Sequence, residues 1–276
     1  MRNCLTVDVE EWFHVCGMEG PLAFERWNTL PSRVVDTTRD VLDLLDACGV
    51  RGTFFVLGWI ADRHPGLVEE IVHAGHEVGS HGHLHQRVYE LTPESFARDL
   101  EAGRAALAAA GVQNVRGYRA PEWSINDRSL WALETLARAG FTFDSSMAPM
   151  RIVGDPDYPT EPHARSTSCG DVMEFPPLVD RRFGQNMPMV GWGLRMTAPG
   201  RVIRIIEDRN ARGIPVALAV HPWEIDPDPP RVKLPPAKNF AHYFRLGGFR
   251  RRLERILRGA TFAPMGEVLG LSPLST

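Results

Sequence analysis

Short apolar runs alternate along the chain with longer segments in which apolar residues recur at helical spacing. Runs typical of β-strands cover residues 3–9, 52–57, 76–80, 115–118, 141–143, 172–175, 215–220 and 261–263. Helical periodicity covers residues 33–48, 60–74, 93–110, 127–139, 199–212 and 246–258. Strands that alternate with helices in this way predict parallel β–α–β units, and therefore an α/β barrel or an open parallel sheet.

Two proline-rich stretches break this alternation. Residues 147–200 show little periodicity, and we expect a loop-rich insertion there, of the kind that is usually either functional or disordered. Residues 225–242 predict an ordered loop. The length of 276 residues suits one α/β barrel, so we expect residues 1–276 to form a single domain.

Composition excludes several classes of protein. The net charge is −3 and the sequence pI is about 6.4, so no nucleic-acid partner is expected. No apolar run approaches the roughly 20 residues that a transmembrane segment needs. The first residues turn acidic before an apolar stretch of signal-peptide length forms, and we expect a cytoplasmic protein. Four cysteines without CxxC spacing favour reduced thiols over a cysteine zinc site or a disulfide framework.

Candidate catalytic groups follow the predicted strands, where the active sites of α/β scaffolds gather. Asp8 and Glu10 close the first strand, and the side-chain period of two puts both carboxylates on one face. Two neighbouring carboxylates repel each other unless a cation lies between them or one is protonated. A pair of solvated acids at a strand end is the alternative interpretation.

His81 and His85 follow the strand predicted at 76–80. Their spacing lets both imidazoles converge on one metal ion in a helical or an extended segment, and imidazole with carboxylate is a normal ligand set for zinc. An HxxxH pair alone is a weak signal, because structural histidines are commoner than ligands. We predict a metal site here since three histidines fall within 81–85 at a strand end.

Three further polar residues follow other strands. Arg119 is placed to hold a carboxylate through parallel hydrogen bonds, or to form a surface ion pair. His221 is a candidate general acid or further metal ligand, with a structural histidine as the alternative. Asp144 either polarises such a histidine or caps a turn.

The motifs TVDVEEWFH, GTFFVLGW, HEVGSHGHLH, GYRAPEWSI, FDSS and VHPWEID occur in this order. With them the chain resembles the polysaccharide deacetylase family, also called the NodB-homology or carbohydrate esterase 4 family. The likeness extends over nearly the whole chain and is greatest to the subgroup associated with bacterial exopolysaccharide gene clusters. It implies a distorted (β/α) barrel with fewer than eight regular units.

The resemblance also implies a metal site. Glu10, His81 and His85 match the metal ligands of the family, with zinc expected first and cobalt or nickel as alternatives. The family's adjacent aspartates are replaced here by Asp8-Val9-Glu10, which leaves Glu11 as a competitor for the ligand role. The usual Ser or Thr after the first histidine is Gly82, so a supporting hydrogen bond is expected to be missing.

For catalysis, the resemblance makes Asp8 the base, Arg119 the group that orients it and His221 the acid, with Asp144 in the region that tunes the acid. The expected reaction is metal-dependent hydrolysis of the N-acetyl group of an amino sugar in a polysaccharide, lipid-linked or small glycoside substrate. The expected substrate-binding residues are Trp123, Pro121, Trp223 and Trp192, with a backbone N–H near 119–121 stabilising the oxyanion. The alternatives are hydrolysis of a cyclic or formyl amide, and a carbohydrate-binding pseudoenzyme.

Overall fold

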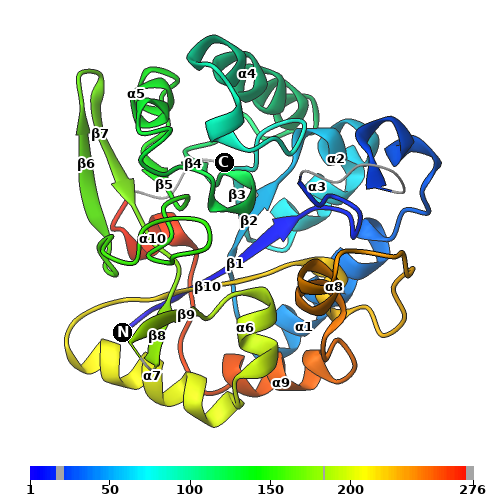
Figure 1. Ribbon diagram of the computed structural model, residues 1–276, viewed down its shortest axis with the longest axis vertical. Helices are drawn as coiled ribbons and strands as arrows, with labels where there is room; N and C mark the ends of the chain where they lie inside the picture. Colours follow the sequence, from blue (N-terminus) through cyan, green and yellow to red (C-terminus); the bar gives the residue numbers. More distant parts are fainter. Residues whose placement is uncertain (17–21, 183, 272–276) are drawn as a thin grey trace.

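The structure, a computed structural model, describes residues 1–16, 22–182 and 184–271. An eight-stranded sheet runs in the order β10-β1-β2-β3-β4-β5-β7-β6 and curls within a ring of helices (Figure 1). The paired strands are parallel except β6 and β7, which are antiparallel. The predicted α/β class and distorted barrel are confirmed.

The strands of this sheet are β1 Cys4–Val9, β2 Thr53–Val56, β3 Glu77–Ser80, β4 Gly117–Tyr118, β5 Phe143–Asp144, β6 His163–Thr167, β7 Gly170–Glu174 and β10 Ala217–Val220. A separate two-stranded sheet consists of β8 Val179–Arg182 and β9 Gln185–Pro188. The α-helices are α1 Val34–Cys48, α2 Gly58–Arg63, α3 Pro65–His73, α4 Pro93–Ala109, α5 Trp131–Arg138, α6 Gly191–Met196, α7 Pro199–Ala211, α8 Pro236–Tyr243, α9 Phe249–Leu257 and α10 Met265–Val268. Among these described helices, none is both long and apolar enough to cross a membrane.

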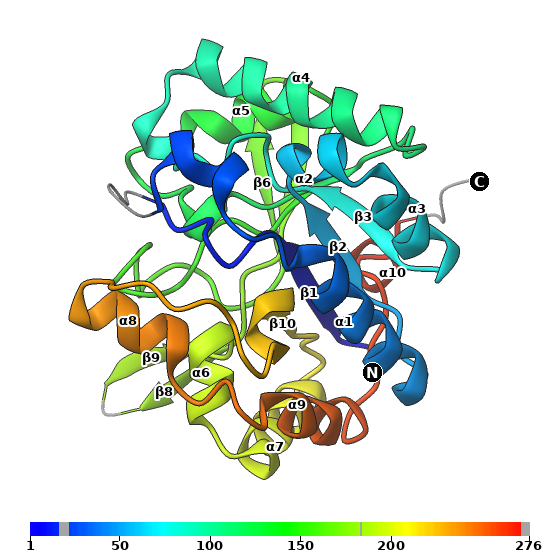
Figure 2. The ribbon, with the colours of Figure 1, turned by 90° about the vertical axis from the view of Figure 1, so that its right-hand side faces the viewer.

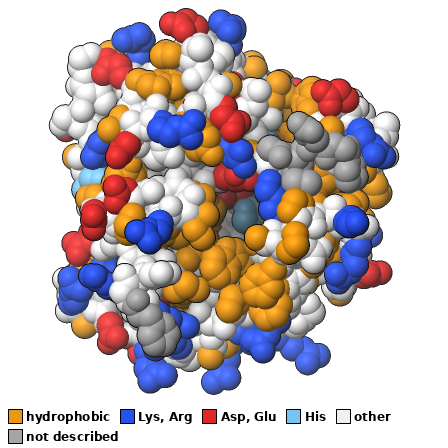
Figure 3. Space-filling model, viewed as in Figure 1, with side chains coloured by type: hydrophobic (Ala, Val, Ile, Leu, Met, Phe, Trp, Pro, Cys, Tyr) orange, Lys and Arg blue, Asp and Glu red, His pale blue; other side chains and the backbone are white. Residues whose placement is uncertain are grey.

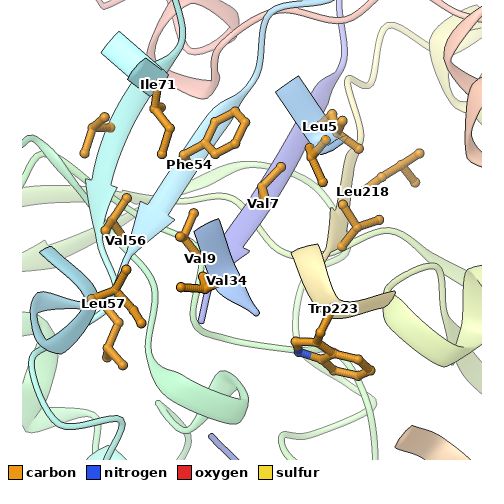
Figure 4. Close-up of a cluster of buried hydrophobic side chains, with 14 of the residues drawn as sticks. Leu5, Val7, Val9, Val34, Phe54, Val56, Leu57, Ile71, Leu218 and Trp223 are labelled. Carbon is orange, nitrogen blue, oxygen red and sulfur yellow. The ribbon is translucent and has the colours of Figure 1, made fainter. Parts of the chain in front are cut away.

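The hydrophobic core explains which face of β1 its acidic side chains occupy. Val7 and Val9 of β1 belong to one buried cluster with Phe54 of β2, Leu218 of β10 and Val34 of α1 (Figure 4). Figure 2 shows the curled sheet with helices along its outer side. Because side chains alternate along a strand, packing Val7 and Val9 against this layer turns the intervening polar positions to the other face. The hydrophobic pattern of β1 therefore sets the direction of Asp8, which lies within the strand, and of Glu10, which directly follows it.

Three predicted elements differ in the structure. The helix predicted over 60–74 is two helices, because Pro65 has no amide hydrogen and keeps His64 out of helical geometry (φ −133°, ψ 55°). Residues 261–263 form only an isolated bridge, Asn3 with Phe262. The predicted helix over 246–258 begins at Phe249, because Gly248 precedes it at φ 81°.

The two proline-rich stretches are more regular than expected. The segment 147–200, expected to be a loop-rich insertion, also contains strands β6 to β9, helix α6 and the start of α7. The segment 225–242 includes most of α8, which sequence reasoning missed. Its prolines, Pro235 and Pro236, lie at the N-cap and first turn, where a missing amide hydrogen costs nothing.

Two buried carboxyl groups meet where β5 pairs with β7. Asp144 lies opposite Glu174, and both residues have no exposed surface. Oδ2 of Asp144 and Oε2 of Glu174 have no donor among the described residues, so one proton shared between them satisfies both atoms. Burial raises the pKa of Asp144 to about 6, and burial together with the Asp144 charge raises the pKa of Glu174 well above its ordinary value.

This pair predicts a pH-dependent stability. The folded pair holds protons that the unfolded chain releases near the ordinary carboxyl pKa values of 3.8 and 4.5, so the free energy of unfolding falls as pH rises through about 6. This fall in the free energy of unfolding is up to about 1.4 kcal/mol per pH unit. Because Glu174→Gln removes the shared proton, we expect the fall to be smaller in this variant. Urea unfolding between pH 4 and 8 measures it, with the exposed Glu101→Gln as control. Parallel curves for Glu174→Gln and wild type would contradict the shared proton.

Candidate functional site

The end of β1 presents two buried acids to one side of the sheet. Asp8 and Glu10 are 2% and 5% exposed. Glu11 turns the other way, where its carboxylate accepts hydrogen bonds from the Ser32 hydroxyl and from the backbone N–H of Arg33 at 3.0 Å. Of the two glutamates that competed for the ligand role, the one that faces the histidines is therefore Glu10.

Glu10, His81 and His85 form a compact group of metal-ligating atoms. Oε2 of Glu10 lies 3.7 Å from Nε2 of His81 and 2.5 Å from Nε2 of His85, and the three ligand atoms lie within 4.8 Å of one another. Nδ1 of His81 bonds to the carbonyl of Arg119 at 2.8 Å, which turns Nε2 toward Glu10. Burial raises the pKa of Glu10, but His85, His81 and His221 outweigh it and hold this pKa well below its ordinary value.

This donor set fits a divalent metal ion. Two imidazoles and one carboxylate suit zinc, and three protein ligands leave a position for water or substrate. The loop that carries the histidines has Gly82 in place of the Ser or Thr of the family, and hydrogen bonds to Asp99 hold this loop. Asp99 accepts the N–H groups of His83 and Leu84 at 2.9 and 3.1 Å, and a Cβ at Gly82 would lie 2.7 Å from that carboxylate.

Arg119 orients Asp8. Its guanidinium is fully buried, and Nη1 donates to Oδ1 of Asp8 at 2.8 Å and to the Thr6 hydroxyl at 2.6 Å. Nε and Nη2 donate to the carbonyl and hydroxyl of Ser145 at 3.0 and 2.7 Å. With these partners the guanidinium has one orientation, and so does the carboxylate that it holds.

His221 follows β10, the neighbour of β1, and its Nε2 lies 3.9 Å from Oδ2 of Asp8 and 3.7 Å from Oε1 of Glu10. Its Nδ1 lies 3.0 Å from Oε2 of Glu224, and Oε1 of Glu224 accepts a hydrogen bond from Nε of Arg195 at 2.8 Å. Burial lowers the pKa of His221, but Glu224, Glu10 and Asp8 outweigh burial and raise it to about 9.

This arrangement corrects the expectation for Asp144. The contact of Nδ1 is Glu224, whereas Asp144 bonds to the Ser146 hydroxyl and pairs with Glu174. Sequence reasoning missed Glu224 and Arg195. The HPWE motif carried a signal for Glu224, since a glutamate three residues after His221 reaches back to it across the short helix Pro222–Ile225. Arg195, far away in the chain, carried none.

Asp8, Glu10, His81, His85 and His221 line one pocket of about 310 Å³. Apart from these groups its walls are mostly apolar, and Trp123 and Trp192 contribute to them. Figure 3 shows the hollow, with acidic and histidine side chains at its bottom and hydrophobic side chains along its rim.

The other two predicted substrate-binding residues have different surroundings. Trp223 also lines the pocket, but its ring stacks on the rings of His221 and His242, at centroid distances of 5.1 and 4.2 Å. Its Nε1 donates to Oε1 of Glu10 at 3.3 Å, so its polar edge contacts the carboxylate of Glu10. Pro121 is buried at the start of the short helix Pro121–Trp123 and is not part of the pocket lining.

The backbone after Arg119 offers one unbonded donor. The N–H groups of Arg119, Ala120 and Trp123 donate to Ser80, Ser146 and Ala120, and Pro121 has no N–H. The N–H of Glu122 has no acceptor among the residues that the structure describes, and Glu122 lines the pocket. The available donor thus lies just beyond the predicted 119–121.

Comparison with known proteins agrees with this geometry. Residues 23–143 match the family model described as polysaccharide deacetylase, and residues 145–270 match a domain of unknown function, DUF3473. A chitooligosaccharide deacetylase of Sinorhizobium fredii is 38% identical over 104 residues, which cover 37% of this chain and 47% of that protein. A peptidoglycan N-acetylglucosamine deacetylase of Bacillus cereus is 31% identical over 104 residues, with 38% and 47% covered. The chain thus spans about half the length of these two relatives.

A crystal structure of a polysaccharide deacetylase candidate from Mycobacterium smegmatis has the same fold. It superposes with a TM-score of 0.62 at 22% identity, over 100% of this chain and 94% of that one. The family model, the curated relatives and the shared fold lead to one conclusion. The chain contains a polysaccharide deacetylase domain, of the type also called NodB-homology or carbohydrate esterase 4.

Proposed function

We propose that this protein is a metal-dependent hydrolase that removes the N-acetyl group from an amino sugar. The observation that carries the proposal is the position of Asp8 and His221, which line one pocket with the Glu10–His81–His85 group and approach each other to 3.9 Å. One carboxylate and one imidazole beside a metal-binding group provide the base and the acid that amide hydrolysis requires.

Glu10, His81 and His85 are the groups that hold the metal, for which zinc is our first choice. A divalent ion there supplies Lewis-acid chemistry, which polarises a carbonyl group and makes water more acidic. Asp8, fixed by Arg119, accepts the proton of the attacking water. Arg119 bonds to Oδ1, and no described residue donates a hydrogen bond to Oδ2, which is the atom that we assign to this proton.

Negative charge then develops on the former carbonyl oxygen, and the N–H of Glu122 is the backbone donor that we assign to it. His221 protonates the departing nitrogen from Nε2, the nitrogen on the side of Asp8 and Glu10. Glu224 bonds to Nδ1 and Arg195 bonds to Glu224, so the imidazolium is oriented and stabilised from behind. These two residues position the acid.

The substrate class rests on the relatives and on the pocket. Both curated relatives named above are deacetylases of N-acetylated sugars, one acting on chitooligosaccharides and one on peptidoglycan N-acetylglucosamine. Trp123 and Trp192, at the pocket, are the side chains that we assign to sugar contact. A polysaccharide, lipid-linked or small glycoside substrate fits, and a role in exopolysaccharide synthesis is the biological setting that we propose.

Acetate release tests the proposal directly. Chelated protein is assayed on N-acetylhexosamine oligomers, lipid-linked sugars and small glycosides, with and without added zinc, cobalt or nickel. We expect acetate release that metal restores, and the best substrate identifies the sugar class. Activity that survives chelation would instead indicate a metal-independent amide hydrolase. Tight metal binding without release from any sugar would contradict the proposed reaction and favour a pseudoenzyme.

Replacing the acid separates its role from metal binding. For His221→Ala we expect turnover to fall by about 10²–10⁴-fold, because the leaving nitrogen loses its proton donor. Metal content, measured by mass spectrometry, should stay at the wild-type level, since His221 is not one of the proposed ligands. His73→Ala, on the exposed side of α3, is the control. Near-normal turnover would refute the assignment, and simultaneous loss of metal would make His221 a ligand instead.

A further inference from the structure

Cys16 makes two contacts with one residue, the proposed metal ligand His85. Its Sγ lies 3.3 Å from Nδ1 of the imidazole and 3.1 Å from the carbonyl oxygen of the same residue. Both residues are buried, at 7% and 6% exposure. The sulfur lies at Nδ1, whereas Nε2 of His85 faces Glu10, so Cys16 contacts the ligand from behind and is not itself in the metal-ligating group.

The proton count of these two contacts determines the tautomer of His85. A thiol has one proton, and a carbonyl oxygen can only accept, so the S–H of Cys16 donates to the His85 carbonyl. The sulfur is then left as an acceptor for the second contact, and Nδ1 must carry the hydrogen. A neutral imidazole with hydrogen on Nδ1 has its lone pair on Nε2, the atom that a metal ion needs.

The same contacts hold an unusual backbone. His85 has φ 52°, in the left-handed region that non-glycine residues rarely adopt. Such a conformation persists only where its surroundings over-determine it. The hydrogen bond from Cys16 to the His85 carbonyl joins the ring contact to the main chain, so one side chain restrains both the backbone and the ring orientation.

Cys16 is itself anchored through its carbonyl oxygen. That oxygen accepts hydrogen bonds from Nη2 of Arg87 at 3.2 Å and from Nζ of Lys238 at 2.7 Å. Arg87 is held in turn by Glu122, at 2.7 Å, and Lys238 belongs to α8. The thiol is therefore presented to His85 from a backbone position that two cations fix.

We propose that Cys16 is a positioning residue for the metal site, which fixes the Nδ1–H tautomer of His85 and its left-handed backbone through a pair of sulfur hydrogen bonds. The proposal rests on the proposed function in one respect, that His85 is a metal ligand. Removing a hydrogen-bond partner that orients a ligand typically weakens metal binding by about 10–100-fold.

Four variants separate the hydrogen bonds from packing. Cys16→Ala removes both bonds and leaves space, and Cys16→Val removes them but fills the space. Cys16→Ser keeps a group that donates to a carbonyl and accepts from Nδ1. Cys4→Ala is the matched control, because Cys4 is also buried but belongs to a hydrophobic cluster with Phe55 and Phe143.

Two measurements are made on each protein. Zinc affinity is obtained by competition with a chromophoric chelator. The Cα and Cβ chemical shifts of His85, recorded without metal, report its backbone conformation. We expect Cys16→Ala and Cys16→Val to bind zinc about 10–100-fold more weakly, with His85 shifts that leave the left-handed range. Cys16→Ser should stay within about threefold of wild type, and Cys4→Ala should match wild type in both measurements.

The proposal fails if Cys16→Val keeps wild-type affinity and wild-type His85 shifts. It also fails if Cys16→Ser is as weak as Cys16→Val, because packing of the sulfur would then be the cause. Should the wild-type protein bind no zinc, the metal site of the proposed function is refuted. The His85 shifts of the metal-free variants then still decide whether Cys16 holds this residue.

Discussion

The buried guanidinium of Arg119 is the interaction on which the rest of the site depends. It follows β4, donates to Thr6 and Asp8 of β1, and donates to the carbonyl and hydroxyl of Ser145 after β5. Its own carbonyl oxygen orients His81. A buried cation needs a complete set of acceptors, and removing one partner of a buried pair typically costs about 3–5 kcal/mol. One residue thus links Asp8, the proposed base, with His81, a proposed metal ligand, and with three strands.

The site is assembled from three stretches of the chain. Asp8 and Glu10 precede the segment that matches the polysaccharide deacetylase family, and His81, His85 and Arg119 lie within it. His221, the proposed acid, lies in the segment that matches DUF3473. Parallel pairing of β10 with β1 brings them together, because the register Val7–Val220 puts the residues after both strands at one edge of the sheet. Neither matched segment alone contains the proposed base, metal-binding group and acid.

The polar residues at the strand ends were predictable from the sequence, because a strand end depends on the local pattern of hydrophobic and polar residues. The alternation in β1 and the histidines after β3 indicated where the polar groups gather, and the structure brings Asp8, Glu10, His81, His85 and His221 into one pocket. Contacts between distant segments were not predictable. Glu224 is paired with Arg195, a residue on a helix within a stretch whose prolines and glycines obscured its periodicity. Asp144 was assigned by motif position, and only the pairing of β5 with β7 showed that its partner is Glu174.

Helix α8 lines the pocket and is also connected, through Arg195 and Glu224, to His221. The guanidinium of Arg195, bonded to Glu224 behind His221, also donates to the carbonyls of Ala241 and Phe244 at the end of α8. Lys238 of α8 bonds to the carbonyl of Cys16, next to His85. A shift of α8 would therefore disturb His221, the proposed acid, through Arg195, and His85, a proposed metal ligand, through Cys16. Since α8 also lines the pocket, contacts that the proposed substrate makes there would act on the same groups to which we assign the chemistry.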